Sequence, residues 1–277
     1  MISCPGIQKK TIRRHYNVST LFYRLLWGRH IHHGYWDADE SPEVAQDQLT
    51  DKLAAAASIA RGSRVVDIGC GMGGSSRRLA KLHDCHVTGV TISPFQKRWA
   101  SLAATRHGLR SRTRFLCADA EQVEFRPGEF DAVWSIECTE HLTDKPEFVR
   151  RAAEWVKPGG AMAICAWLAG PDLDEAKRQQ VYDVCEGMFC PSLATSAEYQ
   201  QWMRDAGLEV EVAEDWTRNV DRTWEICRDR VLRFRMYGAA KLIDRQQIIF
   251  LDRFQTILDA YRSGAMEYGC FVARKPQ

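Results

Sequence analysis

The sequence has no marked excess of charge of either sign. It carries 38 lysines and arginines against 36 aspartates and glutamates, which gives a formal net charge of +2 at pH 7. Proteins that bind nucleic acids or anionic membranes electrostatically normally carry a clear excess of positive charge. The one basic cluster, within Arg106–Arg114, is short enough to be an ordinary solvated face. We therefore expect no nucleic-acid partner.

Long apolar runs and a targeting segment are also missing. No stretch approaches the ~20 apolar residues that a membrane-spanning helix needs, and Met1–Lys10 lacks the apolar core of a secretory signal peptide. The 10 cysteines include no C-x-x-C pair and no Cys/His cluster with zinc spacing. We therefore expect a cytoplasmic protein with reduced thiols, no stable membrane insertion and no metal.

What the sequence does contain is a regular alternation of short apolar strands and helical stretches from Arg64 onward. This pattern is typical of an α/β sheet with parallel strands. The seven predicted strands cover residues 64–68, 85–91, 113–117, 130–136, 161–167, 208–214 and 268–273. The predicted fold is a doubly wound, seven-stranded, Rossmann-like sheet.

Two regions fall outside this alternation. Residues 1–60 are predicted to form an N-terminal helical lid, and residues 220–263 a helical cap inserted before the last strand. Residues 61–219 and 264–277 would then form the core. One predicted helix of the cap has an apolar face that either closes a pocket or forms a subunit contact, so we expect a monomer or a homodimer. Both regions are attached where lids over the carboxyl ends of the strands would be, and open α/β sheets bind ligands at those ends.

The most informative motif, Asp67-Ile68-Gly69-Cys70-Gly71-Met72-Gly73-Gly74, directly follows the first strand. Glycines at such a place let the backbone turn tightly and approach a ligand closely, and the next helix presents free N–H groups to it. The spacing of Gly69, Gly71 and Gly74 also matches the dinucleotide fingerprint G-x-G-x-x-G. A nicotinamide-dependent dehydrogenase is therefore the first alternative.

Two observations argue against a dinucleotide. A dehydrogenase needs an acid about 20 residues further on to hold the ribose, but no Asp or Glu lies between Asp84 and Asp119. In addition, the carboxylate of Asp67 would repel a pyrophosphate, whereas it suits a cationic sulfonium ligand with an amino group. The motif therefore favours S-adenosylmethionine.

Three segments resemble class I S-adenosylmethionine-dependent methyltransferases. Asp67–Gly73 resembles their first motif, Phe115–Ala120 their strand-three motif, and Lys157–Gly160 their turn before strand five. In many such enzymes an acid ends strand two, but this chain carries Gly89–Gln96 there, which resembles a subgroup that replaces the carboxylate with hydroxyls and an amide. The resemblance implies that the donor, and its product S-adenosylhomocysteine, are bound by Asp67, Gly69, Gly71, Thr91, Ser93, Gln96, Asp119 and Ala120.

Two further segments place the chain within that class. Trp27–Asp37 and Val133–Lys145 resemble gamma-tocopherol methyltransferases, and the second also resembles sterol C-methyltransferases. Relatives with this layout methylate nitrogen or oxygen of other natural products. The resemblance therefore implies a largely apolar small-molecule acceptor, with carbon methylation of a prenylated phenol or terpenoid first and nitrogen or oxygen methylation second. A non-catalytic binding module and a macromolecular acceptor are the remaining alternatives.

The loop after strand four is expected to manage the acceptor's proton. Glu137 and His141 lie there, close to the expected position of the methyl group, and we predict them as catalytic residues. Alternatively, His141 is a packing residue and Glu140 an exposed loop acid, while Trp27, Tyr35 and Trp36 form the core of the lid. The predicted acceptor pocket comprises Trp27, His32, His33, Tyr35, Trp36, Glu140, Trp224 and Tyr237. The adjacent His32 and His33 are not expected to bind a metal together.

Overall fold

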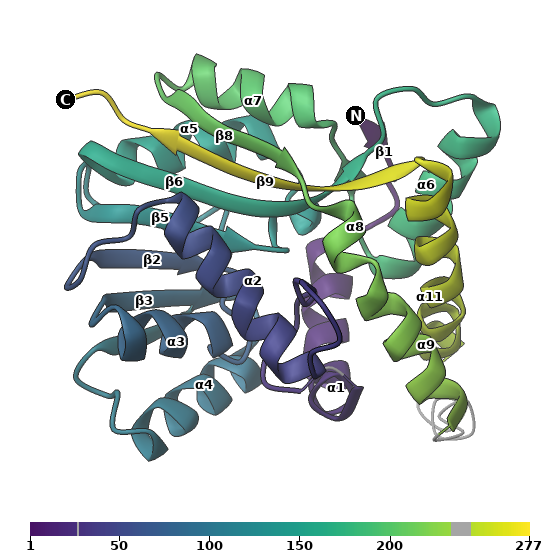
Figure 1. Ribbon diagram of the computed structural model, residues 1–277, viewed down its shortest axis with the longest axis horizontal. Helices are drawn as coiled ribbons and strands as arrows, with labels where there is room; N and C mark the ends of the chain where they lie inside the picture. Colours follow the sequence, from purple (N-terminus) through teal and green to yellow (C-terminus); the bar gives the residue numbers. More distant parts are fainter. Residues whose placement is uncertain (27, 234–244) are drawn as a thin grey trace.

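A seven-stranded mixed sheet forms the centre of the protein (Figure 1). The computed structural model describes residues 1–26, 28–233 and 245–277. The strand order is β4-β3-β2-β5-β6-β9-β8. The strands are β2 (Arg64–Ile68), β3 (His86–Thr91), β4 (Thr113–Cys117), β5 (Phe130–Ile136), β6 (Val156–Ala169), β8 (Glu209–Asp215) and β9 (Met266–Arg274). The prediction of a seven-stranded α/β sheet is thus confirmed.

The two edges of this sheet differ in direction. Strands β2 to β6 pair in parallel, whereas β9 runs antiparallel to both of its neighbours, β6 and β8. The predicted strand 161–167 is longer than expected, because the Lys157–Gly160 segment is included in β6, and the register with β5 shifts there. A second, two-stranded sheet pairs β1 (Ile2–Ser3) with β7 (Ser192–Leu193).

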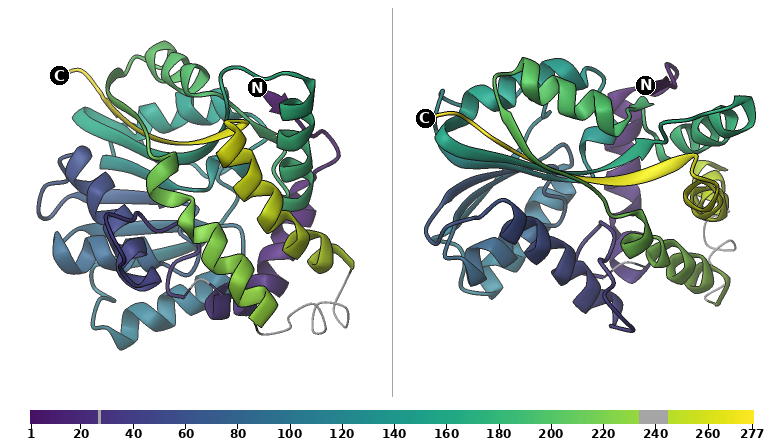
Figure 2. Two further views of the ribbon diagram at one scale, coloured as in Figure 1. Left: turned by 45° about the vertical axis from the view of Figure 1, so that its right-hand side comes forward. Right: turned by 45° about the horizontal axis from the view of Figure 1, so that its top comes forward.

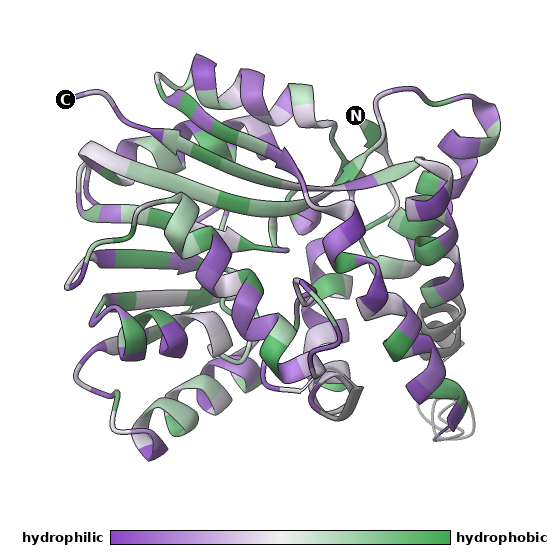
Figure 3. Cartoon of the chain, viewed as in Figure 1, coloured by the Kyte–Doolittle hydropathy of each residue, from purple (hydrophilic) through white to green (hydrophobic). Residues whose placement is uncertain are grey.

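Helices cover both faces of the main sheet. One face carries α2 (Pro42–Ala56), α3 (Gly74–Leu82) and α4 (Pro94–Arg106), and the other carries α5 (Lys145–Trp155) and α7 (Ser196–Asp205) (Figure 1; Figure 2, right). The central strands are mostly hydrophobic (Figure 3), since side chains on both of their faces are covered. Buried side chains form one large apolar cluster on each side of the sheet.

A further group of helices lies beyond the carboxyl ends of the parallel strands. It consists of α1 (Lys9–Leu26), α6 (Glu175–Met188), α8 (Thr217–Val220), α9 (Arg222–Arg233) and α11 (Arg245–Ser263) (Figures 1 and 2). Helix α11 packs on α6 and α9, and Phe254, Ile257, Leu258 and Tyr261 of its predicted apolar face are buried. Helix α6 was not among the predicted elements. The boundaries proposed for lid, core and cap stay a prediction.

Candidate active site

A deep cavity lies at the carboxyl ends of β2, β3, β4 and β5. It encloses about 940 Å³ of atom-free space, its open mouth included, and we call it the donor cavity. Seven of the eight residues predicted to bind the donor line it. They are Asp67, Gly69, Gly71, Thr91, Gln96, Asp119 and Ala120. These residues lie at the ends of three neighbouring strands, β2, β3 and β4, or directly after them, so parallel pairing alone brings them to one edge of the sheet.

The glycine loop after β2 packs so closely against neighbouring segments that side chains would not fit at two of its positions. Gly69 has a φ of +78°, and a Cβ at this position would collide with the side chain of Cys138. A Cβ on Gly74 would meet the ring of His30, with Nδ1 at 2.6 Å. Glycine is therefore required at both positions, for backbone conformation at the first and for close approach at both.

Asp67 presents its carboxyl group at the end of β2. The side chain is buried, and Oδ2 accepts a hydrogen bond from Ser76 Oγ at 2.5 Å. Burial raises the pKa of Asp67 to about 7, despite the hydrogen bonds from Ser76, because desolvation penalises the carboxylate. A cationic ligand in the donor cavity would favour the ionised form.

The first turn of α4, just after β3, provides an amide with a buried, unpaired N–H group. Gln96 Oε1 accepts a hydrogen bond from Thr91 Oγ1 at 2.8 Å, while its Nε2 is buried without a partner. Ser93, which is also predicted to bind the ribose, caps α4 by accepting from Gln96 N, donates to Asn17 Oδ1 at 2.6 Å, and is not part of the cavity wall. The unpaired amide of Gln96 suits a ribose hydroxyl of the donor.

Asp119 connects the donor cavity to helix α1. Its Oδ2 lies 2.5 Å from Lys9 Nζ, which also contacts Glu121 Oε2 at 2.8 Å. Lys9 itself lines the cavity. The N-terminal helix is thus anchored by charge to the strand-three motif.

A second, smaller cavity adjoins the first, and we call it the acceptor cavity. It encloses about 440 Å³ and shares Tyr16, Ile31, Glu137 and His141 with the donor cavity. Its remaining wall is formed by Tyr23, Glu140, Trp167, Met188 and Trp224. Aromatic and aliphatic side chains dominate this wall, so it suits an apolar ligand.

His141 stands at the junction of the two cavities. Its Nδ1 lies 3.0 Å from the carbonyl oxygen of Phe189, and its Nε2 lies 2.7 Å from the hydroxyl of Tyr16. Because a carbonyl can only accept, Nδ1 carries the proton and Nε2 is the hydrogen-bond acceptor. Burial lowers the pKa of His141 to about 4, so the imidazole is neutral at physiological pH.

One carboxylate oxygen of Glu137, Oε1, is held by three contacts with the protein. Its Oε1 accepts hydrogen bonds from the His33 backbone N–H and the Tyr268 hydroxyl, both at 2.8 Å, and lies 2.9 Å from His33 Nδ1. Burial alone would raise the pKa of Glu137, but the charge and hydrogen bonds of His33 outweigh it and lower the pKa. Its φ of +52° is unusual for a residue other than glycine.

The other predicted acceptor residues are distributed around these cavities. His32 lines the donor cavity, and Glu140 and Trp224 line the acceptor cavity. His33 is buried among aromatic rings behind Glu137, whereas Tyr35 packs on Trp216 and is in neither cavity wall. Trp36 lies beside a separate small cavity, where it contacts Arg222. Trp27 and Tyr237 lie outside the described residues.

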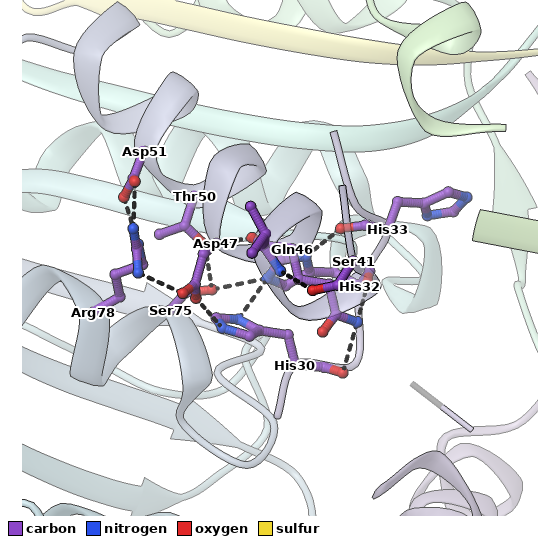
Figure 4. A network of polar contacts seen from close by, with 11 residues as sticks. His30, His32, His33, Ser41, Gln46, Asp47, Thr50, Asp51, Ser75 and Arg78 are labelled. Atoms are coloured by element: carbon purple, nitrogen blue, oxygen red, sulfur yellow. Dashed lines mark hydrogen bonds and ion pairs between the residues drawn. The ribbon is translucent and has the colours of Figure 1, made fainter. Parts of the chain in front are cut away.

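A polar network attaches the segment around His30–His33 to the donor loop (Figure 4). His32 Nε2 lies 2.9 Å from His30 Nδ1 and 3.1 Å from Ser75 Oγ, and His30 Nε2 lies 3.1 Å from Asp47 Oδ1. Arg78 holds Asp47 and Asp51 on α2. These hydrogen bonds compensate His30 and His32 for the loss of contact with water, which allows both polar side chains to be buried.

Several cavity residues were not predicted from the sequence. Tyr16 and Tyr23 lie seven residues apart on α1, a spacing that places them on one face of a helix and that could have identified them. The other residues of the acceptor cavity that were not predicted are Ile31, Trp167 and Met188. Within the described part of the chain, no group of three or more His, Cys, Asp or Glu side chains is arranged to hold a metal ion, and no helix is long and apolar enough to cross a membrane.

The strand order, the glycine loop after β2, the carboxyl groups after β2 and β4 and the unpaired amide of Gln96 together define a class I S-adenosylmethionine-dependent methyltransferase. Residues 6–267 match the family described as mycolic acid cyclopropane synthetase, and the chain belongs to this family. It is therefore an S-adenosylmethionine-dependent methyltransferase that acts on small molecules.

Individual relatives agree with this assignment. The chain is 35% identical to 27-O-demethylrifamycin SV methyltransferase of Amycolatopsis mediterranei over 91% of this chain and 92% of that protein. It is 28% identical to chloroplastic tocopherol O-methyltransferase of Arabidopsis thaliana over 97% and 82% of the two chains. The cyclopropane synthase MmaA2 of Mycobacterium tuberculosis has a similar fold, with a TM-score of 0.87 at 18% identity over 98% of this chain and all (100%) of the other.

Proposed function

We propose that the protein methylates a hydroxyl oxygen of a bulky, largely apolar small molecule, with His141 as the general base. The observation that carries this proposal is the neutral imidazole of His141, which lines both the donor and the acceptor cavity and whose Nε2 is a hydrogen-bond acceptor. Bound S-adenosylmethionine would supply the activated methyl group.

The chemistry of an alcohol or phenol acceptor requires such a base. The hydroxyl must lose its proton as its oxygen takes up the methyl group, and otherwise the methylated oxygen would be left positively charged. His141 Nε2 can take this proton, because the Nδ1–H bond to Phe189 fixes the tautomer and the ring orientation. The enclosed aromatic wall excludes water and aligns the acceptor.

The printed names of two relatives support oxygen as the methylated atom. One acts on a rifamycin that lacks a 27-O-methyl group, and the other is named as a tocopherol O-methyltransferase. Carbon methylation of a prenylated phenol is the second candidate, favoured by the aromatic wall of the acceptor cavity. It would use the same base, since the phenol must also be deprotonated.

Glu137 has a different role in this proposal from the one predicted for it. Three contacts at Oε1 hold its carboxylate in place, and its lowered pKa keeps it ionised near neutral pH. We infer that Glu137 is a positioning residue. It fixes the segment around His33 against β9, and its negative charge faces the donor cavity, where it favours a sulfonium.

The test is a turnover assay that follows S-adenosylhomocysteine with 27-O-demethylrifamycin SV, tocopherols, prenylated phenols, sterols and alkaloid amines. Fragmentation mass spectrometry and NMR of the product would identify the methylated atom. We expect O-methylation by the wild type and a loss of at least 100-fold in kcat for His141→Gln. His107→Gln, at the exposed end of α4, serves as the matched control and should be unaffected.

Two results would contradict the proposal. Transfer to nitrogen of the amines alone would exclude the hydroxyl acceptor. Full activity of His141→Gln on a hydroxyl acceptor would exclude His141 as the base.

A further inference from the structure

Two buried polar atoms in residues of the acceptor cavity wall have no partner in the described part of the protein. Glu140 is 1% exposed; its Oε1 accepts a hydrogen bond from the Trp167 backbone N–H at 2.5 Å, but its Oε2 has no partner. The indole Nε1 of Trp167 is likewise buried and unpaired. Both residues line the acceptor cavity, and neither has been assigned a part in the proton transfer.

Each of the other polar side chains of this wall has at least one partner. The Tyr16 hydroxyl bonds to His141, the Tyr23 hydroxyl to His15 Nε2 at 2.9 Å, and Glu137 has the three contacts described above. An unpaired buried polar group destabilises the folded protein, and it does so more strongly when it is charged. A polar group on a bound ligand would remove this destabilisation at Glu140 and Trp167.

The two atoms differ in their hydrogen-bonding roles. The indole N–H can only donate, and the carboxyl oxygen accepts. A hydroxyl group is both a donor and an acceptor, so it can bond to either of them. Burial also raises the pKa of Glu140 to about 8, so at neutral pH the carboxyl is mostly protonated and can itself donate to a hydroxyl oxygen. An apolar ligand group would leave both atoms unpaired.

We propose that Glu140 and Trp167 bind a second hydroxyl group of the acceptor, which is not methylated. The natural acceptor is then an apolar molecule with two hydroxyl groups, one beside His141 and one held by Glu140. This inference rests on the proposed hydroxyl acceptor and narrows it. Glu140 and Trp167 determine specificity, and their contribution is to binding rather than to proton transfer.

Calorimetric binding in the presence of S-adenosylhomocysteine tests this without requiring turnover. The probes are 2-prenylhydroquinone and 4-prenylresorcinol, kept anaerobic, and 2-prenylphenol, which lacks one hydroxyl of each. We expect at least one diol to bind the wild type 10-fold or more tightly than 2-prenylphenol. Glu140→Leu should reduce that preference below twofold, because it weakens binding of the diol and leaves binding of 2-prenylphenol unchanged. Trp167→Phe should reduce the preference in part.

Two further variants separate recognition from folding. Glu140→Gln keeps the size of the side chain and one acceptor oxygen, so it should retain an intermediate preference. Glu124→Gln, at an exposed carboxyl outside the cavities, is the matched control and should behave as the wild type. Thermal unfolding and S-adenosylhomocysteine affinity of each variant report on its fold.

The outcomes distinguish this inference from the proposed function. A wild type that binds diols and 2-prenylphenol equally, or a folded Glu140→Gln and Trp167→Phe with undiminished preference, overturns the second-hydroxyl site alone. If none of the three compounds binds, or if bound phenols are never methylated on oxygen, the proposed acceptor class itself fails. With active acceptors, the Glu140 variants should raise KM and leave kcat within about threefold.

Discussion

The hydroxyl of Tyr16 lies 2.7 Å from Nε2 of His141, which joins the N-terminal helix α1 to the loop after β5. The Tyr16 hydroxyl donates a hydrogen bond to the same nitrogen that, in the proposed reaction, takes the proton of the methyl acceptor. Tyr16 is therefore expected to hold the imidazole in its reactive orientation until the acceptor hydroxyl arrives.

Replacing Tyr16 by Phe removes this hydrogen bond and keeps the ring. We expect kcat to fall about 10-fold, because His141 is then oriented by the Phe189 carbonyl alone. Affinity for S-adenosylhomocysteine should stay within twofold. Tyr182→Phe, at an exposed tyrosine of α6, is the control. Steady-state kinetics with an identified acceptor make the measurement, and an unchanged kcat would exclude this role.

Donor affinity should depend on pH through Asp67. The pKa of this carboxyl is raised to about 7 by burial, so below pH 7 it is protonated in the free protein. A cationic donor binds the carboxylate, and binding therefore releases a proton. We expect affinity for S-adenosylmethionine to weaken by up to about 10-fold per pH unit as the pH falls below 7. Titration calorimetry in buffers of different ionisation enthalpy would detect the proton.

The variant Asp67→Asn provides the control for this pH dependence. It should bind the donor weakly and with little change between pH 6 and pH 8. A wild type whose affinity is flat over the same range would show that Asp67 is already ionised in the free protein.

Gly69→Ala should destabilise the glycine loop after β2 by more than the cost of placing alanine in a left-handed backbone conformation. Gly69 and Gly62 have nearly equal φ angles, +78° and +79°, but a Cβ on Gly69 would collide with Cys138, whereas a Cβ on Gly62 meets nothing within 4 Å. Left-handed backbone costs alanine roughly 1–2 kcal/mol, so Gly62→Ala measures that cost alone. We expect Gly69→Ala to be less stable than Gly62→Ala and to lose donor binding, as measured by chemical unfolding and calorimetry.

Acidification should destabilise the fold before most carboxylates titrate. Burial lowers the pKa of His15 and His32 to about 3 and that of His141 to about 4, from an ordinary value of 6.5. The unfolded chain therefore binds protons that the folded chain does not, and the stability from these groups is present above pH 6.5 and lost as the pH falls.

Each of these histidines contributes about 1.4 kcal/mol per pH unit between pH 6.5 and its folded pKa. The raised pKa values of Asp67 and Glu140 act in the opposite sense, because their stabilisation is lost as the pH rises toward 7 and 8. Three histidines against two carboxyls should leave a net decrease in the melting temperature from pH 6.5 to pH 4.5. His141→Gln should make that decrease smaller.

The strands and the donor loop could be predicted because they depend on local signals. Buried parallel strands consist of continuous apolar runs, and Asp67 and its glycines follow one of these runs directly. Pairing of the strands then determines where Thr91, Gln96 and Asp119 lie. Residues at the carboxyl ends of β2, β3 and β4 are near each other because these three strands are neighbours in the sheet.

The acceptor cavity depended on contacts that no local pattern encodes. Tyr16 and His141 are 125 positions apart, and Glu137 meets Tyr268 from the far end of the chain. The sequence predicts Glu137 in the site but cannot show that His33 and Tyr268 hold its Oε1. Ser93 was assigned to the ribose, although its hydroxyl caps α4 and bonds to Asn17, because a capping serine and a ligand-binding serine look alike in sequence.

Strand β9 lies between β6 and β8, although it follows both of them in the chain. During synthesis, β8 therefore has no neighbour in the sheet until β9 has left the ribosome, and the long edge of β6 stays unpaired for the same time. Unpaired strand edges invite pairing with other chains. A nascent chain stalled before Met266 should consequently need chaperone protection, and truncations that remove β9 should aggregate rather than yield a smaller folded domain.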